Sequence, residues 1–130
     1  MPHLIVEYSA NIEEALKLPE LLTRLRDCAV ASGVFPLGGI RLRGARRDHY
    51  LIADGDPANA FLHLTARIGQ GRTLEVRQSI AQALFDVLCS HLAELYAERG
   101  LAISVEIQEI DAATSFKKNN LHERLTDPGA

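Results

Sequence analysis

A chain of 130 residues with 47% hydrophobic and 24% charged side chains has the size and composition of one globular domain with a buried core. Its net charge of −3 gives no overall attraction to nucleic acid or to an anionic membrane surface. No apolar run approaches the roughly 20 residues that span a bilayer, and the N-terminus lacks the basic and apolar regions of a signal peptide. Two widely separated cysteines, Cys28 and Cys89, are predicted to be small buried side chains in a reducing compartment. We therefore expect a single cytoplasmic domain over residues 1–130.

The first half of the chain predicts a strand, a helix and a second strand. Apolar and polar residues alternate over residues 3–9, which is typical of a half-buried strand. Asn11 and Glu14 then have the spacing of a helix cap. Helical spacing of apolar residues runs from Pro19, a residue suited to a first helical position, to a stop at Gly33. A turn and the start of a second strand follow, over residues 35–39 and 40–43.

The second half of the chain repeats this plan. Residues 61–68 alternate as a strand does, and a Gly69-Gln70-Gly71 turn leads to Thr73, a good helix N-cap. An apolar stripe predicts one continuous helix from about Leu74 to Arg99. Alternation over residues 101–108 predicts the last strand.

Two successive strand–helix–strand units define the predicted fold class. Units of about 50 residues imply right-handed crossovers and parallel strands within each unit. Side by side, the units at about 2–58 and 59–111 form an α+β domain, a four-stranded sheet with both helices on one face. The other face has no helix to cover it, and the helices carry apolar residues off their main stripe, so we expect an oligomer; these residues are Val76, Ala83 and Val87. Residues 46–59 are predicted to be a loop or hairpin, and the polar tail at 112–130 to end loosely, with part of it around a neighbouring subunit.

Pro2, directly behind the initiator methionine, is the first candidate for chemistry. Cells remove an initiator methionine that precedes a small residue, and the mature chain would then begin with a secondary amine. Such an amine becomes a competent general base when its pKa lies near neutrality. The bland interpretation is that proline is simply common at this position, and retention of Met1 would abolish the amine.

Arg41 and Arg72 are the second candidates, because each lies beside a glycine-containing turn at a matching place in its repeat. A nearby guanidinium lowers the pKa of an amine, and one pKa unit corresponds to about 1.4 kcal/mol. Arg72 also precedes a helix N-terminus, where an arginine and the helix amides can bind a carboxylate together. The alternative for either residue is a solvated surface charge.

Other kinds of site have weaker support. The basic cluster of the second strand has no interleaved aromatic residues, so we do not expect nucleic acid as a partner; its members are Arg41, Arg43, Arg46 and Arg47. The five histidines lack metal-ligand spacing, so no metal site is expected. Neither cysteine has a local histidine partner that would favour a nucleophilic role.

Taken together, these motifs are similar to a known family. Pro2, the two repeats, and the segments 35–41, 68–72 and 116–120 resemble the 5-carboxymethyl-2-hydroxymuconate delta-isomerases of the tautomerase superfamily. The superfamily also includes 4-oxalocrotonate tautomerase and macrophage migration inhibitory factor. The resemblance extends over nearly the whole chain, to about Leu125.

The resemblance implies a cofactor-free keto–enol isomerase of homoprotocatechuate breakdown, working as a homotrimer on an unsaturated tricarboxylate. It implies that Pro2 moves a proton from the 2-hydroxyl to C5, that Arg41 and Arg72 hold substrate carboxylates, and that Phe35 and Phe116 shape the pocket wall. Two alternatives stay open: a tautomerase for another 2-hydroxydienoate or an arylpyruvate, and a non-catalytic oligomeric binding protein with the same fold. The arginine-rich loop at 44–50 departs from the family pattern and could alter which acid binds.

Overall fold

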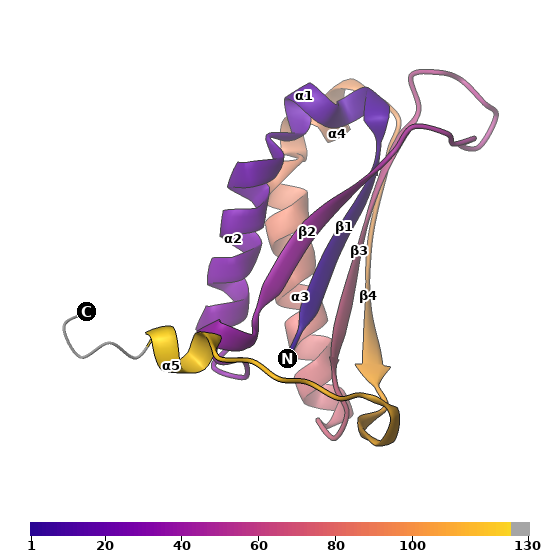
Figure 1. The fold of residues 1–130 in the computed structure, drawn as a ribbon. Coiled ribbons are helices and arrows are strands. Elements are labelled where there is room, and N and C mark those ends of the chain that lie inside the picture. The colour runs from indigo at the N-terminus through magenta and orange to yellow at the C-terminus, as the bar shows by residue number, and fades with distance from the viewer. Residues whose placement is uncertain (126–130) are drawn as a thin grey trace.

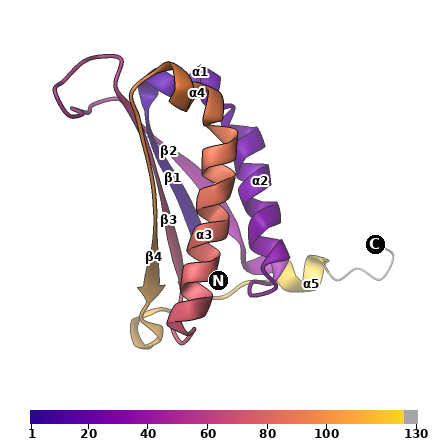
Figure 2. The same ribbon diagram turned by 180° about the vertical axis from the view of Figure 1, so that it is seen from behind.

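The computed structural model describes residues 1–125 and shows a four-stranded sheet covered on one face by two long helices (Figure 1, Figure 2). The sheet order is β2-β1-β3-β4. Pairing is parallel within each half, β1 with β2 and β3 with β4, and antiparallel between β1 and β3 at the centre. The strands are β1 (His3–Ser9), β2 (Arg41–Arg47), β3 (Ala60–Gly69) and β4 (Leu101–Ile110). The predicted α+β fold with both helices on one face is confirmed.

The hydrophobic core lies between the sheet and the helices α2 (Leu18–Ala31) and α3 (Leu74–His91). Alternation along the central strands decides which side chains enter it, because successive residues of a strand point to opposite faces. The buried positions of β1 and β3 include Leu4, Val6, Tyr8, Leu62, Leu64 and Ala66. The residues between them face away from the helices, so polar and charged side chains gather on the uncovered face.

The predicted helix boundaries hold where a capping residue sets them. The helix α2 carries Pro19 in its first turn, and it ends just before Gly33, whose φ of +73° is readily adopted only by glycine. The side chain of Thr73 accepts a hydrogen bond from the backbone N–H of Val76 at 3.2 Å, which caps α3 as expected.

The prediction of one helix from 74 to 99 is wrong, because the chain departs from helical geometry at Leu92. Leu92 has φ −98° and ψ 9° and separates α3 from α4 (Ala93–Glu98). Its side chain is 1% exposed, so the core anchors it while the backbone changes direction. The short α4 therefore lies beside α1 (Glu13–Leu16) at one end of the sheet (Figure 1, Figure 2).

Asn11 does not cap a helix, so that prediction is also wrong. It lies in a 3₁₀ turn (Ala10–Ile12), and its side-chain amide donates to the carbonyl of Asn59 at 2.7 Å and to that of Pro57 at 3.2 Å. Asn11 thus holds the end of the loop 48–59, where backbone carbonyls would otherwise lack donors. The second strand is longer than expected and reaches Arg47 before this loop begins.

The tail is more ordered than predicted. A 3₁₀ turn (Ala112–Thr114) and a final helix α5 (Leu121–Leu125) follow β4, and residues 115–120, here called the strap, cross the end of the sheet between them (Figure 1). Cap residues explain this order: the Asp111 carboxylate accepts from Ala113 N–H at 2.9 Å, and the Asn119 side chain accepts from Leu121 N–H at 2.8 Å. The rest of the predicted tail lies outside the described residues.

Three smaller expectations concern exposure. Cys28 and Cys89 are half-buried, not buried as predicted, and both are free thiols. Of the apolar residues off the main helical stripe, Val76 and Val87 pack partly against the core and Ala83 is exposed. No helix within residues 1–125 is both long enough and apolar enough to cross a bilayer.

Candidate functional site

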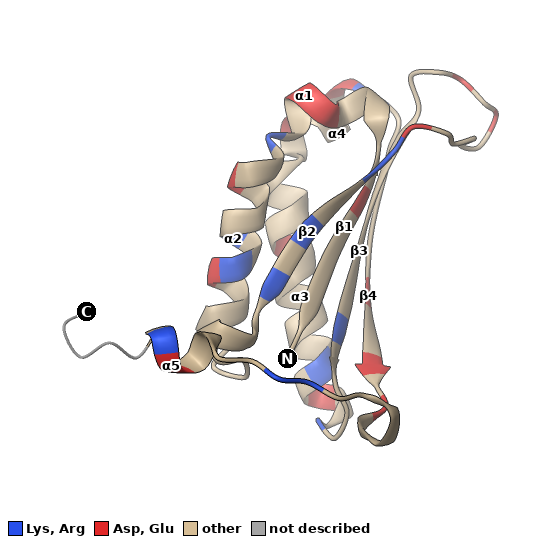
Figure 3. Ribbon diagram, viewed as in Figure 1, with Lys and Arg blue, Asp and Glu red and all other residues tan. Residues whose placement is uncertain are grey.

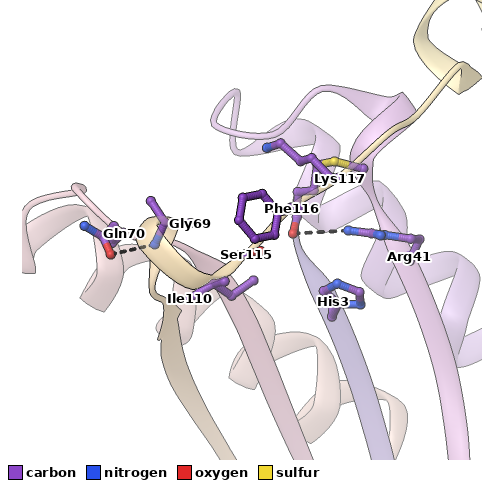
Figure 4. A pocket seen from close by; sticks show the side chains of 10 residues that line it. His3, Arg41, Gly69, Gln70, Ile110, Ser115, Phe116 and Lys117 are labelled. Carbon is purple, nitrogen blue, oxygen red and sulfur yellow. Dashed lines mark hydrogen bonds between the residues drawn. The ribbon is translucent and has the colours of Figure 1, made fainter.

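A cavity of about 440 Å³ opens where β1 begins, beneath the strap (Figure 4). Strands supply its floor and the segment after β4 supplies its roof. Its wall contains basic and polar side chains and no carboxylate among the described residues, although the whole chain carries a net charge of −3. The lining residues are Met1, His3, Arg41, Gly69, Gln70, Ile110, Ala112, Ser115, Phe116 and Lys117.

Arg41 lies directly beside the N-terminus, because β2 pairs in parallel with β1 from its first residue. Its backbone N–H donates to the carbonyl of Pro2 at 3.1 Å, and its Nη2 donates to the carbonyl of Met1 at 3.4 Å. The Nε of Arg41 is buried and has no acceptor among the described residues. The guanidinium lines the cavity as a whole, so its remaining N–H groups can donate to a ligand oxygen.

Pro2 is buried, and its nitrogen is joined by the peptide bond to Met1, a residue of the cavity wall. The structure therefore brings two predicted site residues, Pro2 and Arg41, to one point. Loss of Met1 would leave the Pro2 nitrogen as the group at this part of the wall.

The electrostatic surroundings of the N-terminus are those that a base requires. Burial lowers the pKa of the Met1 α-amine below its ordinary value, and the positive charges of Lys117, Arg41 and Arg72 lower it further. Each cation disfavours a second positive charge nearby. The same surroundings would act on an amine at Pro2, the adjacent residue.

Arg72 contributes to this potential, but its guanidinium lies outside the cavity lining. Its Nη1 donates to the carbonyl of Gly69 at 2.9 Å and its Nη2 to that of Val34 at 3.4 Å. The guanidinium also lies 4.9 Å from the ring centroid of Phe35, a cation–π contact. Phe35 is itself a buried core residue, and its ring packs against the Arg72 guanidinium. The substrate-binding roles assigned to Arg72 and Phe35 stay predictions.

The strap brings Phe116 and Lys117 to the cavity from a distant part of the sequence (Figure 4). Phe116 is 93% exposed, so it lines the opening rather than the core. Figure 3 shows the basic stretch of the strap passing close to the N-terminus. The role of Phe116 in substrate binding stays a prediction that this placement is consistent with.

Both ends of the strap are fixed to the domain. In the turn that leads into the strap, the Gln70 side chain accepts a hydrogen bond from Ala112 N–H at 3.0 Å. At the other end of the strap, the Asn119 side chain donates to the carbonyl of Gly38 at 2.8 Å, and α5 packs on the 3₁₀ turn Leu37–Gly39. Gly38 admits this packing because His122 of α5 occupies the space where a Cβ would lie.

His3 and Lys117 line the cavity but were not identified as site residues from the sequence. Arg43 Nη1 lies 3.1 Å from His3 Nδ1, and a guanidinium can only donate, so Nδ1 is the acceptor. Burial and then the charges of Arg41, Arg43 and Arg67 lower the pKa of His3, which favours the neutral ring. Its position next to Pro2 was the available signal, because a residue adjacent to a catalytic terminus lies near any substrate.

The arginine-rich loop does not reach the cavity within one chain. Arg46 and Arg47 end β2, and six residues of strand correspond to about 20 Å from Arg41. Each also has a carboxylate nearby: Arg46 contacts Asp48 at 2.9 Å and Arg47 contacts Glu7 at 2.7 Å. Residues 1–125 contain no group of three His, Cys, Asp or Glu side chains placed to hold a metal ion.

Comparison with known proteins decides the family. A model of the 5-carboxymethyl-2-hydroxymuconate isomerase family matches residues 2–125. The chain belongs to this family. It is 44% identical over 122 residues to the 5-carboxymethyl-2-hydroxymuconate Delta-isomerase of Escherichia coli, covering 94% of this chain and 97% of that protein. The isomerase resemblance drawn from the sequence is therefore confirmed, and the alternative of a non-catalytic binding protein is not supported.

Solved structures agree with the assignment to the 5-carboxymethyl-2-hydroxymuconate isomerase family. The crystal structure of a 5-carboxymethyl-2-hydroxymuconate isomerase from Deinococcus radiodurans R1 matches with a TM-score of 0.91 at 44% identity, covering 97% of this chain and 95% of that chain. A native fused 4-OT matches with a TM-score of 0.70 at 24% identity, covering 96% and 99%. The second likeness shows a shared tautomerase fold. The chain is thus an isomerase with that fold.

Proposed function

We propose that this isomerase converts 5-carboxymethyl-2-hydroxymuconate to its keto form, with the amine of Pro2 as the base. The observation that supports this most directly is the position of the N-terminus. It lies in a cavity lined by no carboxylate of residues 1–125, where burial and three cations favour a neutral amine. A substrate of this kind is an anion, and the cavity offers it positive charge within an acidic protein.

The proposed reaction moves one proton and leaves the composition of the substrate unchanged. The neutral Pro2 amine takes the proton of the 2-hydroxyl, and the oxygen electron pair forms the carbonyl at C2. The double bonds shift along the chain, and the prolyl ammonium returns the proton to C5. Negative charge develops on the oxygen during this transfer, so a guanidinium such as that of Arg41 lowers the barrier. A base and fixed positive charge suffice for these steps, so we propose that no cofactor takes part.

We extend the proposal to the setting of the reaction. The proposed substrate belongs to homoprotocatechuate breakdown, and the proposed location is the cytoplasm. The proposed assembly is a homotrimer whose sheets turn their uncovered faces inward. Support for an assembly comes from the sheet face that no helix of the described chain covers (Figure 1).

The first test is chemical and concerns the terminus. The intact mass of natively expressed protein should correspond to a chain that begins at Pro2. A variant with one residue fused ahead of Pro2 should lose turnover of 5-carboxymethyl-2-hydroxymuconate in an ultraviolet assay, because an amide nitrogen has no basic lone pair. Pro2→Ala, which keeps a primary amine, should retain a small part of the rate. Full activity of the extended chain would contradict the proposal.

Substrate identity is tested separately. A panel containing 5-carboxymethyl-2-hydroxymuconate, a second 2-hydroxydienoate and an arylpyruvate enol should show the highest kcat/KM for the first compound. If the protein preferred either of the other compounds, the proposed role of Pro2 as base would stand and the proposed substrate would be wrong. Loss of all three activities in a chain that begins at Pro2 would exclude the proposed chemistry.

A further inference from the structure

Lys117 is a cationic group of the cavity that the proposed mechanism does not use. The strap carries it across the opening, while Arg41 and His3 come from the strands below (Figure 4). Within residues 1–125 no acidic side chain forms an ion pair with Lys117. An ammonium group held over a cavity without a carboxylate partner is a place for the carboxylate of a ligand.

The position of Lys117 is fixed by the fold. Gln70 holds Ala112 in the turn just before the strap, and the contact of Asn119 with Gly38 holds the other end. A lysine on a segment with two fixed ends loses less freedom when it binds a ligand than one on a free tail. The neighbouring Lys118 does not line the cavity, although it has the same charge and lies one residue away.

We propose that Lys117 determines specificity by binding the carboxylate that distinguishes a tricarboxylate substrate from a dicarboxylate. Arg41 lines the cavity beside the N-terminus, which suits a carboxylate near the reacting atoms. Lys117 comes from the strap above the strands, which suits a second anionic group on a branch of the same substrate (Figure 4). This inference rests on the proposed function, because it names the side chain that binds one carboxylate of the proposed substrate.

The positive charge of Lys117 also has the largest effect among the three cations that lower the pKa of the Met1 amine. A lysine whose charge lay far from the terminus would not change the protonation of the base. Loss of the lysine should therefore raise the pKa of the Pro2 amine, and the acidic limb of the pH profile of kcat/KM should move to higher pH. The shift should occur with every substrate, because it belongs to the enzyme.

The decisive experiment compares Lys117→Gln with Lys118→Gln on two substrates. For Lys117→Gln, the plateau value of kcat/KM should fall at least about tenfold with 5-carboxymethyl-2-hydroxymuconate, as expected when a charged hydrogen bond is lost. With 2-hydroxymuconate, which lacks the carboxymethyl group, it should change less than about threefold, the limit expected for a rim charge. Lys118→Gln should resemble the wild type with both. An equal fall on the two substrates, or none on either, would overturn the proposal.

Binding without turnover separates this proposal from the proposed function. Titration calorimetry with propane-1,2,3-tricarboxylate and with pentanedioate should show that the wild-type protein prefers the tricarboxylate and that Lys117→Gln loses the preference. That result would support the role of Lys117 even in a protein that turned over neither dienol, in which case the proposed reaction alone would fail. Equal preference in wild type and Lys117→Gln, or no binding of the tricarboxylate by the wild type, would overturn the role of Lys117.

Discussion

We expect the substitution Gly38→Ala, which adds one methyl group, to release the strap. A Cβ at this position would lie 2.7 Å from Nδ1 and 2.9 Å from the backbone nitrogen of His122. Ordinary carbon contacts lie at about 3.5–4.0 Å, so α5 has to move by roughly half an ångström or more. Since one contact is with backbone, a change of side-chain rotamer does not relieve it. Gly38→Ala should therefore displace α5 and loosen the strap that ends there.

The expected size of the effect follows from the weakness of the attachment. The Asn119–Gly38 hydrogen bond contributes about 0.5–1.5 kcal/mol, and the residues of α5 are only partly buried or exposed. A disturbance of about 1.4 kcal/mol changes the equilibrium constant between the closed and open strap about tenfold. We expect kcat/KM for 5-carboxymethyl-2-hydroxymuconate to fall between about twofold and tenfold, with little change in the free energy of unfolding of the sheet domain.

Two assays and two further variants check this reasoning. Limited proteolysis should cut the strap of Gly38→Ala faster than that of the wild type. Asn119→Ala should have a similar effect, and the double variant should add little, since both changes release the same contact. Gly39→Ala is the matched control for proteolysis, because a Cβ there meets no atom closer than 3.4 Å. A Gly38→Ala protein with wild-type proteolysis and kcat/KM would refute the role of the Gly38 contacts in holding the strap.

Three other predictions follow from burial and charge. Leu64 is 0% exposed at the centre of β3, so Leu64→Ala should lower the free energy of unfolding by about 2–5 kcal/mol in urea titrations. Leu51 is 85% exposed, and Leu51→Ala should change the same quantity by no more than about 0.5 kcal/mol. Equal effects of the two substitutions would contradict the assignment of Leu64 to the core. Arg41→Ala should lose about 2–5 kcal/mol of transition-state stabilisation, measured from kcat/KM. Arg47 lies at the far end of β2, so Arg47→Ala should keep the wild-type kcat/KM. An unchanged kcat/KM in Arg41→Ala would show that Arg41 is not part of the site. The pKa of His3 is lower in the folded protein than its ordinary value of 6.5. Between these two pKa values, the unfolded state binds more protons than the folded state. Stability should thus rise with pH from the folded-state pKa up to about 6.5, and His3→Gln should flatten that part of a urea-midpoint series; an unaltered slope would show that other groups cause it.

The sequence was sufficient for the parts of the fold that repeat simple patterns. Alternation identified the strands, and single residues with strong local preferences, Thr73 and Gly33, set helix ends that the structure reproduces. The antiparallel pairing of β1 with β3 was not predicted, because it depends on how the two units pack and has no local signal. The break at Leu92 was missed for the same reason, since its leucine continues the apolar stripe while the backbone turns.

The candidate site was predictable only in part. Pro2 and Arg41 were identified from their positions, and the parallel register of β1 and β2 explains why they meet. Lys117 was not identified as a site residue, because its approach depends on Asn119 contacting Gly38, 81 residues away in the sequence. Asn11 was misassigned for a related reason: its amide binds Asn59 and Pro57 instead of its own helix. Long-range polar contacts of this kind leave no periodic pattern.

The antiparallel centre of the sheet gives the two repeats opposite polarity. β1 starts beside the cavity, whereas β3 starts at the far end of the sheet, where the side chains of Asn11 and Arg99 bind the carbonyls of Asn59 and Ala58. The second unit therefore begins in the middle of the chain, where the backbone nitrogens are amides and the carbonyl oxygens of Ala58 and Asn59 already accept hydrogen bonds. Internal repetition has doubled the scaffold without doubling the reactive end, so each polypeptide can supply one terminal amine at most.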